Sequence, residues 1–186
     1  MSDRDADSDH VDRVRAQWRV VRPDLDTSPV GIVARVGRLA SYFDQSTNAV
    51  MAEYGLNRSA WDILASLRRL GKPYQLTPSE LYRELMRSSG WMTNRLNELE
   101  DAGLIARRPD PADGRGVLVR LTPDGVRLVD TIIGRHLANE ERLISALPNA
   151  ERDRLAGLLR RLLLTHEPKA TASSGRGRPV SNKRRR

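Results

Sequence analysis

Apolar residues recur at helical spacing over most of the chain, which predicts three helices before residue 71 and two after residue 122. The first three are expected over residues 10–22, 26–55 and 57–70, with Thr27 to Pro29 as the capped start of the second. The two after residue 122 are expected to run into the 140s and to follow Pro148. The helices before residue 56 and after residue 122 have apolar faces larger than one small domain can cover. We therefore expect a homodimer in which residues 26–55 and 126–166 pair two copies. A larger monomeric helical core is the alternative.

The segment 76–125 has a different pattern, with two short helices followed by two short strands. Thr77, Pro78 and Glu80 form a capping box that begins the first helix. Ser88 or Ser89 begins the second, and strands are expected over 105–108 and 117–121. The polar stretch 109–116 between them is too long for a tight hairpin and is predicted to project as a wing. This order predicts a winged helix-turn-helix unit over 57–125, in a mainly α fold with a small β-wing.

The second short helix is the expected recognition helix, since this element fits a DNA major groove. Its N-terminal amides and dipole suit Ser88 and Ser89 for phosphate contacts, and Asn94 suits an adenine edge. In the wing, Arg115 stands between two glycines and suits the narrow minor groove. Trp91 has two readings, a contact with a thymine methyl or packing onto the preceding helix. The predicted DNA-binding residues are Ser88, Ser89, Trp91, Thr93, Asn94 and Arg115.

The net charge of +8 is concentrated at the C-terminus. Residues 169–186 hold seven Lys and Arg and no acid, so the preceding 168 residues carry 25 basic and 24 acidic side chains. Residues 1–9 and 167–186 are expected to be disordered, the first acidic and the second basic. The sequence Arg176–Gly177–Arg178–Pro179 resembles an AT-hook that binds A/T-rich minor grooves. A nonspecific, DNA-attracting tail is the alternative for these four residues.

Several classes of protein are disfavoured by what the sequence lacks. There is no cysteine, and no apolar run approaches the roughly 20 residues of a membrane span. The three histidines are far apart, and neither a phosphate loop nor a nucleophile motif occurs. We therefore expect a cytoplasmic, nucleoid-associated protein that is not an enzyme and that needs no metal or cofactor. A constitutive architectural protein of A/T-rich DNA, without a ligand, is the alternative to a regulator.

The run MTNRLNELEDAGLIARRPDPADGRGVLVRLTPDG, with its Asp113–Gly114–Arg115 wing tip, resembles the MarR family of bacterial transcription regulators. The likeness extends over roughly residues 10–166. It implies a homodimer on palindromic duplex DNA, with recognition helices about 34 Å apart. It also implies a transcriptional role, for which we expect repression.

Other segments resemble the urate-responsive branch of that family. They are the added N-terminal helix with Trp18, and the runs Trp61–Asp62–Ile63–Leu64, Thr93–Asn94–Arg95 and Ala106–Arg107–Arg108. The resemblance implies a ligand site formed by Trp18, Asp62, Arg95 and Arg107. Urate is a flat anion, so arginine forks, an N–H acceptor and an indole wall suit it.

Each of these residues also has a simpler interpretation. Trp18 can anchor its helix, Asp62 and Arg95 can form an ion pair, and Arg107 can hold a phosphate. Xanthine, another aromatic acid or no ligand at all are the alternatives to urate. Because Arg95 lies on the expected recognition helix, ligand binding is expected to be coupled to DNA release.

Overall fold

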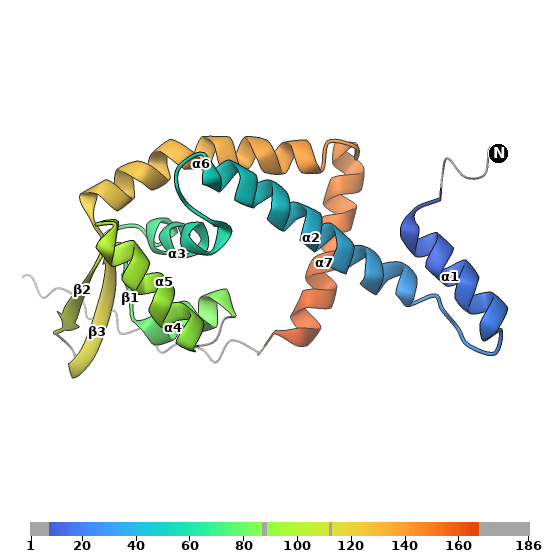
Figure 1. Cartoon of the computed structure of the whole chain (residues 1–186), viewed down its shortest axis with the longest axis horizontal. Helices are drawn as coiled ribbons and strands as arrows, with labels where there is room; N and C mark the ends of the chain where they lie inside the picture. The colour runs from blue at the N-terminus through green and yellow to red at the C-terminus, as the bar shows by residue number, and fades with distance from the viewer. Residues whose placement is uncertain (1–7, 87–88, 112, 168–186) are drawn as a thin grey trace, which may run out of the picture. The chain divides into compact units, whose positions relative to one another are not determined.

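The computed structural model describes residues 8–86, 89–111 and 113–167 and confirms a mainly helical chain with a small sheet (Figure 1). The elements are α1 (His10–Val21), α2 (Val30–Ala52), α3 (Arg58–Arg69), β1 (Gln75–Leu76), α4 (Pro78–Leu85), α5 (Ser89–Asp101), β2 (Ile105–Asp110), β3 (Asp113–Leu121), α6 (Pro123–Leu143) and α7 (Asn149–His166). They fall into two compact units, Met1–Leu143 and Ile144–Arg186. Across the described ranges, no helix is both long enough and apolar enough to cross a membrane.

The core of the first unit lies where α3, α4, α5, α6 and the wing strands meet. Helix α3 contributes most, because its apolar residues recur every three or four positions and all face inward. The side chains that are completely or almost completely buried include Ile63, Leu64, Leu67, Leu81, Met92, Leu96, Ile105, Val119 and Ile132. Burial of this set fixes the recognition helix and the wing on one rigid base.

Three of the predicted helix starts are confirmed by their caps. The side chain of Asn57 accepts a hydrogen bond from the Ala60 amide at 2.9 Å. Thr77 and Glu80 form the reciprocal capping box, with Glu80 Oε2 2.7 Å from the Thr77 amide. Thr122 Oγ1 accepts from the Gly125 amide at 3.0 Å and so begins α6. Each cap satisfies amides that lack a partner in the first turn of a helix.

The predicted strand bounds of the wing, 105–108 and 117–121, are wrong, because both strands extend into the stretch 109–116. Strands β2 and β3 continue through Pro109↔Val117 to Asp110↔Asp113, with an irregularity between Pro109 and Asp110. Pro109 is tolerated because the strand order β1-β3-β2 makes β2 an edge strand. Gly116 allows the strands to close, since a Cβ there would lie 2.9 Å from the Cβ of Asp110. The third strand, β1, was also not predicted; it pairs Leu76 with Val119.

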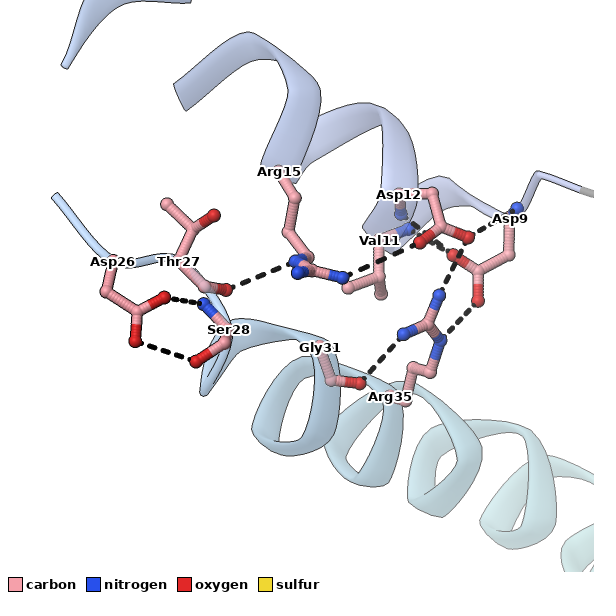
Figure 2. A network of polar contacts seen from close by, with 9 residues as sticks. All are labelled: Asp9, Val11, Asp12, Arg15, Asp26, Thr27, Ser28, Gly31 and Arg35. Carbon is pink, nitrogen blue, oxygen red and sulfur yellow. Dashed lines mark hydrogen bonds and ion pairs between the residues drawn. The ribbon is translucent and has the colours of Figure 1, made fainter. Parts of the chain in front are cut away.

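The predicted capped start of the second helix is wrong as well. Helix α2 begins after Pro29, and no side chain caps it. The hydroxyl of Ser28 instead donates to Asp26 at 2.8 Å, and the carbonyl of Thr27 accepts from Arg15 Nε at 3.2 Å. Ser28 and Asp26 therefore bond to each other within the loop, and the Thr27 carbonyl joins the loop to the preceding helix (Figure 2).

Helix α1 is held on α2 by ionic contacts around one buried side chain, Val11 (Figure 2). Arg35 of α2 lies 2.7 Å from Asp9 and 2.7 Å from Asp12, so one guanidinium bridges two carboxylates. Asp9 also caps α1 by accepting from the amides of Val11 and Asp12, at 2.7 and 2.9 Å. This cluster of Asp9, Asp12 and Arg35 is the α1–α2 latch.

We predict that Asp9→Asn loosens α1 in a pH-dependent way. Hydrogen bonding from Arg35, and then from the Asp12 amide, lowers the pKa of Asp9 from 3.8 to about 2. A lowered folded-state pKa contributes stability that is present above about pH 4 and is lost as the pH falls toward 2. At pH 7 the α1 amides of the mutant should therefore exchange hydrogen severalfold faster than those of the wild type.

The mutant-to-wild-type ratio of exchange rates should approach one as the pH falls through this window. Asp24→Asn is the matched control, because Asp24 pairs with Arg22 in the loop and not with α2. A ratio that stays constant between pH 7 and pH 2 would contradict the assignment of the latch.

Candidate DNA interface and ligand site

Helix α5 presents a polar face because its apolar residues are committed to the core. Met92, Leu96 and Leu99 are buried at helical spacing, which leaves Thr93 and Asn94 exposed on the other side. Asn97, Glu98 and Asp101 continue that exposed face toward the end of the helix. Of the predicted DNA-binding residues, Thr93 and Asn94 thus lie on the exposed face of α5.

Four of the DNA-binding predictions lie beyond what the structure describes. Ser88 falls outside the described residues, and so do the side chains of Ser89, Trp91 and Arg115, although Ser89 begins α5 and Arg115 lies within β3. The AT-hook-like segment Arg176, Gly177, Arg178 and Pro179 also lies outside the described residues. These assignments remain predictions.

Two exposed arginines of the wing were not assigned from the sequence. Arg108 of β2 and Arg120 of β3 lie on the same outward face, because their strands pair in the register Arg108↔Leu118 and Ala106↔Arg120. Val119 and Leu121, on the inward face, are buried. Side chains alternate between the two faces of a strand, and this alternation could have identified the pair from the sequence. Together they place positive charge on the outward face of the wing.

Asp62 and Arg95 are both partly buried and charged, but they do not pair with each other. Asp62 accepts from Arg58 Nε at 2.9 Å, and Arg58 reaches across to Asp44 of α2 at 3.0 Å. Arg95 pairs with Glu98, one turn further along α5, and its buried Nε has no acceptor in the described part of the chain. The alternative interpretation of an Asp62–Arg95 ion pair is therefore wrong.

Arg107 is bound to the recognition helix rather than oriented toward solvent. Glu100 accepts from its backbone amide at 2.8 Å and from its guanidinium at 2.5 Å. Asn97 accepts from the same guanidinium at 2.8 Å. Three hydrogen bonds thus join β2 to the last turns of α5, and the wing and recognition helix are connected through Arg107.

Trp18 is not brought near Asp62 within one chain. Its helix packs against the N-terminal half of α2, around Gly31 and Arg35. Asp62 is tied through Arg58 to Asp44 and Asn48 of α2, about 14 and 20 Å along the helix from Arg35 at 1.5 Å per residue. The Trp18 side chain is 47% exposed, so Val11 is the apolar anchor of α1.

Comparison with known proteins decides the family. Residues 54–116 match the family model described as MarR family. The HTH-type transcriptional regulator PecS of Dickeya dadantii (strain 3937) is 36% identical over 152 residues, which span 82% of this chain and 92% of PecS. The chain belongs to the MarR family. It is a DNA-binding transcriptional regulator of the winged helix-turn-helix class, and its relatives are regulators rather than enzymes.

Solved structures of MarR proteins have the same fold. A mutant MarR from E. coli complexed with operator DNA aligns with a TM-score of 0.64 at 24% identity, over 78% of this chain and 97% of that one. AbsC, a MarR family regulator from Streptomyces coelicolor, aligns with a TM-score of 0.69 at 19% identity, over 76% and 97% of the two chains. The element order of this chain is therefore that of the MarR fold.

Proposed function

We propose that this MarR protein is a homodimeric repressor that binds palindromic duplex DNA and is released from it by urate or a related aromatic anion. The observation that carries the ligand proposal is the placement of Arg95 and Arg107. One lies on α5 and the other is hydrogen-bonded to it, so an anion that recruits both cations acts directly on the recognition helix. Asp62 is the third group of the proposed site. Trp18 does not lie near Asp62 within one chain, so it would reach the site from the second copy of the dimer.

The dimer is supported by apolar side chains that the single chain leaves uncovered. In the N-terminal half of α2, Ile32, Val33, Val36 and Leu39 are all exposed. Helix α7, taken by itself, has no buried residue, and six of its leucines are at least two-fifths exposed. Contiguous apolar surface of this kind marks an interaction site, and a second copy is its simplest occupant.

DNA binding through α5 and the wing is supported by the exposed Asn94 and the outward arginines of β2 and β3. It is also supported by the solved complex of E. coli MarR with operator DNA, whose fold this chain shares. Palindromic DNA follows from the proposed two-fold dimer, since each recognition helix then reads one half-site.

The test is a titration of the protein on the promoter of its own gene, with and without a panel of urate, xanthine and simple aromatic acids. Urate at millimolar concentration is expected to weaken DNA binding at least tenfold and to raise the melting temperature of the free protein. If no member of the panel produces either effect, the ligand proposal is wrong. Footprinting on the same DNA should show one or two discrete palindromes, whereas spread protection of A/T-rich DNA would support the architectural alternative.

A further inference from the structure

The two arginines of the proposed site form ion pairs with carboxylates of the recognition helix. Arg95 pairs with Glu98 and Arg107 with Glu100, and both glutamates belong to α5. An arginine fork that binds a planar anion in two-point fashion uses the same N–H groups that now bind these carboxylates. A ligand anion and the two glutamates therefore compete for the same donors.

Glu98 lies on the face of α5 where a change in its charge state would act on bound DNA. Glu98 follows Asn94 by four residues, on the same exposed face of α5 and about 6 Å along its axis. Its side chain is 57% exposed, whereas that of Glu100 is 34% exposed and bridges α5 to β2. Separations of this size are within the Debye length of about 8 Å at physiological salt, so a phosphate at the helix would sense an uncovered carboxylate.

We propose that ligand binding acts by exchange of ion-pair partners: the anion takes Arg95 and Arg107 from Glu98 and Glu100, and the uncovered carboxylates repel the DNA backbone. This inference rests on the proposed ligand site. It assigns Glu98 and Glu100 as positioning residues that hold the two arginines in the DNA-binding state. Loss of the Arg107 guanidinium from Glu100 and Asn97 also weakens the connection between α5 and β2, which then keeps only the bond from the Arg107 amide to Glu100.

A double-mutant cycle on DNA affinity tests the exchange without any ligand. Arg107→Gln is made in the wild type and in Glu100→Gln, and Arg95→Gln in the wild type and in Glu98→Gln. Removing an arginine removes its attraction for DNA in the wild type and in the Glu→Gln variant alike. Only in the wild type does it also leave a glutamate carboxylate without its ion-pair partner. The loss of affinity should therefore be about threefold larger in the wild-type background, as expected for one unit charge near a phosphate in water.

Equal losses of affinity in the two backgrounds would overturn the inference. This cycle needs no urate, so it decides the role of the glutamates even if the wild type proves unresponsive and the proposed ligand fails.

A second measurement follows the urate response of the double variant Glu98→Gln, Glu100→Gln. With weaker competition for the arginines, this variant should bind urate more tightly by calorimetry, yet urate should weaken its DNA binding several times less than in the wild type. Asp101→Asn is the control, because it removes the same charge from an exposed position of the same helix and should keep the wild-type response. A double variant whose DNA release by urate matches the wild type would contradict the exchange.

Discussion

Gly125→Ala is expected to destabilise the winged unit by about 3 kcal/mol, the upper part of the range for overpacked sites. A Cβ at this position would lie 2.1 Å from the carbonyl oxygen of Leu104 and 3.1 Å from a methyl carbon of Leu121. The Leu104 carbonyl cannot move away freely, because it accepts from the Thr122 amide at 3.1 Å. Relief of the clash therefore breaks the junction between the wing and α6.

Gly134→Ala provides the matched control on the same helix. No atom lies within 4 Å of the position of its Cβ, so the added methyl meets only open space. An alanine in a helix interior is more favourable than glycine by about 0.5–1 kcal/mol, so this variant is expected to be more stable than the wild type. Urea unfolding followed by circular dichroism measures both, and similar midpoints for the two variants would contradict the packing at Gly125.

Helix starts were predictable because the residues that decide them are neighbours in the sequence. The capping box of Thr77 and Glu80 and the cap at Asn57 depend on side chains three residues from the amides that they satisfy. The start of α2 is the exception. Thr27 and Ser28 are residue types that often cap helices, but here they bond to Asp26 and Arg15 instead of to the first amides of α2. The contact with Arg15 depends on the packing of α1 against α2, which local sequence does not show.

The wing was predicted in kind but not in length. The proline and glycine residues between 109 and 116 argue against strands when only the local sequence is considered. The pairing of β2 with β3 shows why strands can contain them. Gly116 is needed for close approach of the strands, and a sequence alone does not distinguish that use of glycine from flexibility.

The candidate ligand site was predicted as a set of residues, but their partners were not. Arg95 and Glu98 are three residues apart on one helix, so this pair was visible in the sequence. The pairing of Arg107 with Glu100 requires the chain to reverse at Gly103, and that of Arg58 with Asp44 requires α2 and α3 to pack. Contacts of this kind depend on tertiary structure, which is why the ion pairs of Arg107 and Arg58 become clear only from the fold.

Loss of the urate response is the expected result of Asp62→Ala and of Arg95→Ala. Each removes one charge-assisted hydrogen bond to the ligand, and such bonds contribute about 1.5–3 kcal/mol, so urate affinity should fall at least tenfold in each variant. Because Arg95 also lies on the recognition helix, the affinity is measured by calorimetry on free protein, separately from DNA binding.

Two variants outside the site control for the change in charge. Asp130→Ala removes an acid that pairs with Arg68, and Arg135→Ala removes a base that pairs with Glu53. Both positions are partly exposed ion pairs like those of the site, so a nonspecific effect of charge on the binding of an anion should appear in them as well. Wild-type urate affinity in Asp62→Ala and Arg95→Ala would show the site assignment to be wrong. A general effect of charge would instead raise the affinity for the anion in Asp62→Ala and Asp130→Ala and lower it in Arg95→Ala and Arg135→Ala.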